Sequence, residues 1–478
     1  MRKLIFLLLL LCPFSLTHGT AQKNVRRDAA NAVDVYAVVA EVERIAAART
    51  LWPNFDPRRV PVEIYDGQTT LLFQHPAPPP EFVSLSSRQG VWAFPGRHET
   101  VTANAPVKLN NVLTATVMFK PGGRESLRER AALVVHETFH VFQRERHPKW
   151  AGDELELFVY PFDDAELLAL RRLETEALRR ADEARRKLPD ARCWARLALT
   201  TRRERFARMR AGAVTYERAT ELNEGLARYV EARAAGTHTA NLPAGEYPST
   251  DLRTRAYATG HAFALLLERF APVWTTRLEA GENLSLDELL NAALSQESAP
   301  ASNADNKAAS SDASASSRAC ALPGSFAETA RRRAGVEVAS LQEQRATKRR
   351  EFEAQGGWKI VVKADAGAPL WPQGFDPLNV LRLGLREVLH TRYLKLGNDA
   401  GAIEILDRHS LTEGAGAEHP LWGGVRQLTL AGITEEPAAH EAAGKTTITA
   451  ANIKGEFRGA QLERAGQTLS ITLQSASK

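Results

Sequence analysis

The chain has 478 residues, of which 25% are charged and 44% are hydrophobic, and this length predicts two or three domains. The net charge of +5 is only mildly basic, and the arginines between Arg171 and Arg218 are interleaved with acidic residues. We therefore expect a solvated helical face in that stretch and no nucleic-acid partner. Cys193 and Cys320 are too few for a disulfide scaffold, and the sequence leaves open whether they pair.

The N-terminus has the pattern of a secretory signal peptide. Arg2-Lys3 is a short basic segment, Leu4 to Leu11 is an apolar run, and Gly19-Thr20-Ala21 supplies small residues for cleavage. The apolar run is too short for a membrane span, and no later stretch approaches eighteen consecutive apolar residues. We therefore assign residues 1–21 to a cleaved leader, and expect a secreted or periplasmic protein without a transmembrane segment.

The rest of the chain divides into five segments that differ in composition and predicted secondary structure. Residues 22–122 predict a helix followed by strands and turns, and residues 123–295 are strongly helical. Alanine, serine, asparagine and aspartate dominate residues 296–324, which is typical of a linker. A charged helix is expected over residues 325–355, and a C-terminal β domain over residues 356–478. The predicted fold class is α+β.

The segment His136-Glu137-Thr138-Phe139-His140 has the H-E-x-x-H pattern of a zinc site. Residues four apart on a helix lie one above the other on the same face, so both imidazoles can bind one metal ion. The glutamate after the first histidine is carried alongside, where it can act as general base on a water activated by zinc. This pattern predicts a hydrolase with Zn²⁺ as its cofactor.

The residues around this motif predict that it lies in the middle of a helix. Ser126 and Glu129 have the spacing of a capping box at a helix start, and Pro148 indicates the end. Before the helix, the β-branched and apolar stretch Leu113–Phe119 predicts a strand. We expect this strand to be the sheet edge beside the site, with backbone groups free to pair with an extended peptide.

A catalytic zinc ion usually takes a third protein ligand. The metzincin pattern is excluded because Gln143 and Arg146 stand where that class needs glycine and histidine. His147 is close in sequence, but Pro148 argues for a helix end there. The acidic candidates are Glu154, Glu156, Glu174, Glu176, Glu217, Glu221, Glu224 and Glu231.

The segment Asn223–Glu231, with the sequence NEGLARYVE, resembles the N-E-G-x-x-x-Y-x-E segment of the gluzincin metallopeptidases. This superfamily includes aminopeptidase-N-like, leukotriene-hydrolase-like and thermolysin-like enzymes. The resemblance implies that Glu224 is the third zinc ligand. It also implies that Glu231 supports a ligand histidine, since a carboxylate on the ring N–H fixes the tautomer and raises the basicity of the ligand.

The segment Tyr257–Phe263, with the sequence YATGHAF, resembles the Y-x-x-G-x-x-F helix of the aminopeptidase branch. There the tyrosine donates a hydrogen bond to the developing oxyanion, which implies this role for Tyr257. His261 is a second candidate for the same role. The resemblance covers residues 113–290, under half of the chain.

Two features depart from the aminopeptidase pattern. About eighty residues separate His140 from Glu224, which implies an additional helical hairpin. The G-x-M-E-N segment that binds a free substrate amine is missing, and residues 111–119 stand in its place. We therefore favour an endopeptidase over an aminopeptidase.

The sequence thus predicts an exported zinc metallopeptidase that acts on a peptide or protein substrate, with a zincin-like catalytic core and a C-terminal β domain. One alternative is a binding or surface protein on a zincin scaffold, with a structural or vestigial metal site. Another alternative is a zinc hydrolase of non-peptide bonds, because the same residues polarise any carbonyl.

Overall fold

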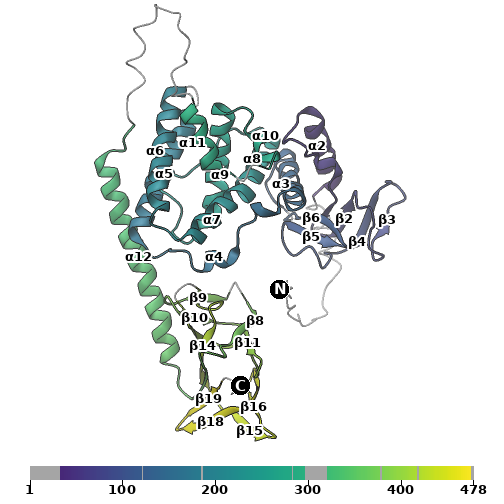
Figure 1. Ribbon diagram of the computed structural model, residues 1–478. Helices are drawn as coiled ribbons and strands as arrows, with labels where there is room; N and C mark the ends of the chain where they lie inside the picture. Colours follow the sequence, from purple (N-terminus) through teal and green to yellow (C-terminus); the bar gives the residue numbers. More distant parts are fainter. Residues whose placement is uncertain are drawn as a thin grey trace, which may run out of the picture. The chain divides into compact units, whose positions relative to one another are not determined.

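The computed structural model describes residues 33–120, 122–184, 187–281, 284–296, 320–376, 379–416 and 419–474. The predicted leader and most of the predicted linker lie outside these ranges. The described chain is of the α+β class and forms two compact units (Figure 1). The larger unit takes its residues from 33–157 and 164–335, and the smaller unit takes them from 158–163 and 336–474. None of the described helices is long and apolar enough to cross a membrane.

The larger unit contains one six-stranded sheet with the order β3-β4-β2-β1-β6-β5. The strands are β1 (Val62–Tyr65), β2 (Thr69–Phe73), β3 (Val83–Ser84), β4 (Val91–Pro95), β5 (Ala105–Leu109) and β6 (Val112–Met118). β6 pairs in parallel with β1 and antiparallel with β5. The prediction that Leu113–Phe119 forms a free sheet edge is therefore wrong, because β5 covers that side.

A tight turn at Asn110 and Asn111 explains the covered edge. Both residues adopt positive φ angles, of 44° and 64°. Asparagine tolerates this conformation, and two such residues in succession make the hairpin turn whose twist matches that of the strands. The turn folds β5 back onto β6, so that β5 becomes the edge strand on this side of the sheet.

Helices form the rest of the larger unit. They are α2 (Val35–Ala48), α3 (Leu127–Arg146), α4 (Glu154–Phe158), α5 (Ala165–Glu183), α6 (Leu188–Phe206), α7 (Ala211–Thr220), α8 (Leu226–Ala235), α9 (Leu252–Phe270), α10 (Trp274–Glu279), α11 (Leu286–Gln296) and the start of α12 (Gly324–Glu353). Short 3₁₀ turns η2 (Pro57–Arg59) and η3 (Pro148–Trp150) and a π-helical turn η4 (Glu221–Gly225) complete them. The consecutive helices α5 and α6, which lie between His140 and Glu224 in the sequence, pack along each other (Figure 1).

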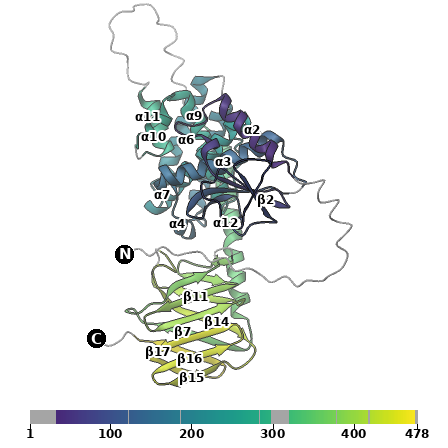
Figure 2. The same cartoon turned by 90° about the vertical axis from the view of Figure 1, so that its right-hand side faces the viewer.

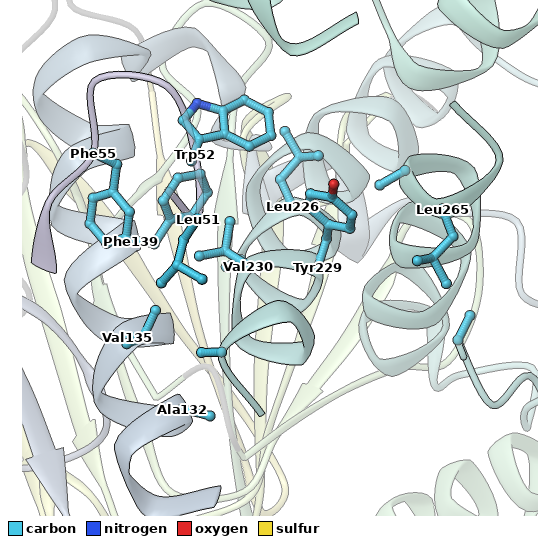
Figure 3. Close-up of a cluster of buried hydrophobic side chains, with 14 of the residues drawn as sticks. Leu51, Trp52, Phe55, Ala132, Val135, Phe139, Leu226, Tyr229, Val230 and Leu265 are labelled. Carbon is cyan, nitrogen blue, oxygen red and sulfur yellow. The ribbon is translucent and has the colours of Figure 1, made fainter. Parts of the chain in front are cut away.

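α3 begins where the sequence predicts. The Ser126 backbone N–H donates to the Glu129 carboxylate at 2.8 Å, and the Ser126 hydroxyl accepts from the Glu129 backbone, so the capping box is complete. One face of α3 packs through Val135 and Phe139 against a buried cluster with Trp52 and Tyr229 (Figure 3). This packing holds the motif helix against α8.

Several arginines of the Arg171–Arg218 stretch are buried, so the predicted solvated face is wrong for them. They are Arg171, Arg172, Arg202 and Arg205. Arg202 and Arg205 lie within 2.8 Å of Glu174, and their side chains are 1% exposed. Arg202 also pairs with Glu221, and Arg205 pairs with Glu217. The charged residues on these helices therefore face each other inside the unit.

The Cys193 and Cys320 side chains form a disulfide in this unit, which answers the question that the sequence left open. The bridge joins α6 to the residues just before α12 and closes a loop with a sequence separation of 127.

The smaller unit consists mainly of two antiparallel-rich sheets. Their orders are β18-β19-β7-β14-β13-β10-β9 and β15-β16-β17-β12-β11-β8. The strands are β7 (Trp358–Ala364), β8 (Trp371–Phe375), β9 (Val380–Arg382), β10 (Glu387–His390), β11 (Tyr393–Asn398), β12 (Gly401–Leu406), β13 (Ser410–Gly414), β14 (Val425–Ile433), β15 (Ala438–Ala442), β16 (Lys445–Ala450), β17 (Ile453–Arg458), β18 (Ala460–Ala465) and β19 (Thr468–Leu473). One hydrophobic cluster takes Ile360 and Val362 from the first sheet and Ile403 and Ile405 from the second. The two sheets therefore pack face to face (Figure 2).

Candidate metal centre

Three predicted ligand side chains converge at one point in the larger unit. His136 and His140 lie one turn apart on α3, and Glu224 comes from η4. The two Nε2 atoms are 3.1 Å apart, and His140 Nε2 is 3.2 Å from Glu224 Oε2. All three residues are buried, and together they form a group that could hold a metal ion.

Glu231 orients the first histidine. Its Oε2 atom lies 3.0 Å from His136 Nδ1. A carboxylate at this distance accepts a hydrogen bond, so the Nδ1 atom carries the proton. Burial opposes protonation of the other ring nitrogen, Nε2. The hydrogen bond and the charge of Glu231 outweigh this effect and raise the pKa of His136.

Gln143 orients the second histidine. Its amide nitrogen donates to the backbone carbonyls of Leu222 and Asn223, at 3.1 and 2.9 Å. These two bonds fix the amide so that its oxygen faces His140 Nδ1, at 2.8 Å. His140 therefore also carries its proton on Nδ1, and its Nε2 atom presents a lone pair. The sequence reasoning treated Gln143 only as evidence against a metzincin and missed this role.

The donor set fits a zinc ion. Tetrahedral zinc binds nitrogen and oxygen at about 2.0–2.2 Å, which places neighbouring ligand atoms roughly 3.3–3.6 Å apart. The ligand distances given above are within a few tenths of an ångström of that range. Two imidazole lone pairs and a carboxylate oxygen at such distances repel each other, and a shared cation removes the repulsion.

Arg253 holds the other side of the ligand carboxylate. Its Nη2 atom donates to Glu224 Oε1 at 2.5 Å, and its Nη1 atom donates to Glu154 Oε1 at 2.9 Å. Glu224 is thus left with Oε2 for the metal, which favours one-oxygen coordination. Burial acts to raise the pKa of Glu224, but its polar and charged neighbours, Arg253 among them, outweigh it and lower the pKa to about 2.

Tyr257 lies at the centre, as the resemblance implied. Its ring stacks on His136 with a centroid distance of 5.9 Å, and its hydroxyl interacts with the Glu224 carboxylate. Burial and the charge of Glu224 raise the pKa of Tyr257, so the hydroxyl stays protonated near neutral pH. His261, the second candidate, lies in the core against Tyr229, with ring centroids 6.3 Å apart.

Glu137 follows the first histidine and lies beside the centre. Its side chain is buried, and its Oε2 atom has no hydrogen-bond partner among the described residues. Burial raises the pKa of Glu137, although both histidines act against this. A carboxylate with a raised pKa and a free oxygen is suited to accept and return a proton.

The other candidate ligands have other partners. His147 stacks on Trp150 at 3.9 Å, and its Nε2 atom lies 2.9 Å from Glu279. The remaining glutamates each pair with at least one arginine: Glu154, Glu156, Glu174, Glu176, Glu217 and Glu221. Comparisons of the chain with protein-family models, with curated proteins and with solved structures find no match.

Proposed function

We propose that this protein is an exported zinc metallopeptidase of the gluzincin type. The observation that supports this most directly is the buried convergence of two imidazole nitrogens and one carboxylate oxygen, with Glu137 beside them. In this proposal His136, His140 and Glu224 hold the ion, and Glu231 and Gln143 fix the two imidazoles.

The chemistry divides between the ion and the protein side chains. A bound Zn²⁺ supplies a Lewis acid and lowers the pKa of water from 15.7 to about 7. Glu137 accepts the proton of the attacking water and returns it to the leaving amine. The protonated Tyr257 hydroxyl donates a hydrogen bond to the carbonyl oxygen as negative charge develops there.

The substrate is proposed to be a peptide or protein, cleaved as by an endopeptidase rather than an aminopeptidase. A zinc hydrolase of non-peptide bonds is the second candidate. It is favoured by one observation: β6, the strand predicted to receive the peptide, is paired on both sides. The edge strand beside β6 is β5, so a peptide substrate would have to pair with β5, whereas a non-peptide substrate would not.

The decisive experiment is a cleavage-site profile of a peptide library with the purified protein. Zinc content is measured in parallel, and the assay is repeated after treatment with a chelator and after zinc is restored. We expect about one zinc per chain and cleavage that is lost with the chelator and recovered with zinc. A zinc-loaded protein that cleaves no peptide would favour the non-peptide hydrolase or a binding protein with a structural metal site.

A further inference from the structure

Arg144 is an exposed arginine next to the candidate metal centre. It follows His136 and His140 at the same spacing of four residues, so all three lie on one face of α3. Its Nη1 atom donates to the backbone carbonyl of Pro106 at 2.8 Å. Arg144 therefore lies between the centre and the edge strand β5.

The Pro106 carbonyl faces away from the sheet. Opposite Pro106, Ala115 donates its N–H to Pro61 beside β1, so the Ala115 backbone points away from β5. Such a pair is of the non-hydrogen-bonded kind, in which both backbones point outward. Hydrogen-bonded and non-hydrogen-bonded pairs alternate along the ladder, so Pro106 and Lys108 are the β5 residues whose backbone groups face away from β6.

These outward groups offer little to an extended peptide. Pro106 has no N–H, and its carbonyl already accepts from Arg144. Only Lys108 can form the usual pair of backbone hydrogen bonds with an added strand. Proline and a cationic side chain are also the means by which proteins block sheet edges. An extended peptide can therefore pair with β5 at Lys108 but not at Pro106, where Arg144 occupies the carbonyl.

The charge of Arg144 is not balanced by a salt bridge in the described part of the chain. Its hydrogen bond to Pro106 is to a neutral carbonyl, and no described carboxylate lies within ion-pair distance of Arg144. Partial burial of the guanidinium lowers the pKa of Arg144, and the charge of nearby Glu224 acts against this. Arg253 differs, because its two terminal nitrogens bind Glu154 and Glu224.

We propose that Arg144 binds the C-terminal carboxylate of the substrate, so that the enzyme removes a short C-terminal fragment. This rests on the proposed zinc peptidase and specifies cleavage near the C-terminus of the substrate, in place of the internal cleavage of an endopeptidase. Four helical residues advance about 6 Å from His140 to Arg144. An extended peptide covers this length with about two residues, at roughly 3.3 Å each. Hydrolysis adds water across the scissile C–N bond, and the released amino acid or dipeptide keeps the carboxylate that Arg144 binds.

The test compares two peptides of the same sequence, one with a free C-terminal carboxylate and one with a C-terminal amide. We expect the wild-type kcat/KM to be about ten- to a hundredfold higher for the acid, as for a charge-assisted hydrogen bond. Arg144→Gln should bring this ratio close to one, and Arg144→Lys should retain part of it. The control Arg146→Gln, at an exposed arginine of the same helix, should keep the wild-type ratio.

The possible failures are distinguishable. If the wild type cleaves the acid and the amide equally well, the Arg144 proposal is overturned and the peptidase proposal stands. An acid preference that persists in Arg144→Gln, with zinc content unchanged, also overturns it. If no peptide is cleaved, the dissociation constants of the two peptides from the zinc-loaded protein are compared by fluorescence anisotropy. Equal constants then count against the carboxylate site independently of catalysis.

Discussion

Gly225 of η4 lies directly against Gly260 of α9. A Cβ atom on Gly225 would stand 2.5 Å from the Gly260 Cα, and one on Gly260 would stand 2.7 Å from the Gly225 Cα. Neither distance is possible between non-bonded carbon atoms, so both positions need glycine. Glu224 precedes one of these glycines and Tyr257 lies one turn before the other, so this contact aligns both side chains with the histidines.

We expect Gly260→Ala to disturb the metal centre. The added methyl group must push η4 away from α9, which costs about 1–3 kcal/mol and displaces Glu224. Zinc affinity, measured by competition with a chelator, should fall at least tenfold, with a lower thermal midpoint. Gly335→Ala is the matched control, because a Cβ there meets no atom within 4 Å. Wild-type zinc affinity in Gly260→Ala would show that the contact does not position the ligand.

The sequence predicts the motif helix well because its signals are local. The capping box at Ser126 and the stop at Pro148 lie within one turn of the helix ends. Glu224 is different, because eighty residues and several helices separate it from His140. Only the resemblance of its segment to a known one singled it out among eight glutamates. Its π-helical turn and its bond to Arg253 have no signal in the local sequence.

The two wrong predictions have a common cause in long-range pairing. Composition could not distinguish an arginine in water from one opposite a buried glutamate. Arg202 and Arg205, three residues apart, share a helix face, as do Glu217 and Glu221, four residues apart. The spacing shows that each face is charged, and only the packing shows that the faces meet. The β5 edge likewise depends on a pairing that strand propensity does not reveal.

Glu231 should control zinc affinity without binding the ion. Glu231→Gln keeps the size of the side chain and removes the charge that stabilises the Nδ1–H tautomer of His136. We expect a 10- to 100-fold loss of zinc affinity in chelator competition. Glu204→Gln is the control, since Glu204 is an exposed glutamate that also pairs with an arginine. An unchanged affinity in Glu231→Gln would contradict the orienting role.

The buried ion network should make the larger unit sensitive to acid. Burial acts to raise the pKa of Glu217, but Arg205 outweighs it and lowers the pKa to about 2. The pKa of Glu174 is lowered by arginines in the same way, while burial raises that of Glu221. A lowered carboxyl pKa stabilises the folded state above the unfolded value of about 4.5. This contribution is lost as the pH falls from about 4.5 to 2. Glu221 acts in the opposite direction, because its raised pKa makes protonation favour the folded state.

Glu217→Gln tests this network. The substitution leaves the buried Arg205 with one carboxylate fewer, which should lower the free energy of unfolding by about 3–5 kcal/mol at pH 7. The loss of stability between pH 4.5 and 2 should also become less steep than in the wild type. Thermal midpoints measured across this range, with Glu204→Gln as the exposed control, provide both comparisons. Equal midpoints for wild type and Glu217→Gln at pH 7 would refute the stabilising role of the pair.

Glu137 is expected to act on the reaction and not on the metal, because it lies beside the ligands without being one. Glu137→Gln keeps the shape of the side chain and removes its basicity. Turnover should fall by roughly 10²- to 10⁴-fold, with zinc content near one per chain. Glu224→Ala should instead lose zinc and turnover together. Tyr257→Phe should retain zinc and lower turnover through the missing hydrogen bond.

The three variants differ in kind, so they separate the roles of these residues. Zinc content distinguishes Glu224 from the other two residues. The pH profile of kcat/KM distinguishes Glu137 from Tyr257, because only Glu137→Gln removes a group that must be deprotonated, and so the acidic limb of the profile. Restoring the ionisable carboxyl with Glu137→Asp should recover that limb at reduced rate. A Glu137→Gln protein that cleaves its substrate at the wild-type rate would exclude this hydrolytic mechanism and favour the binding-protein alternative.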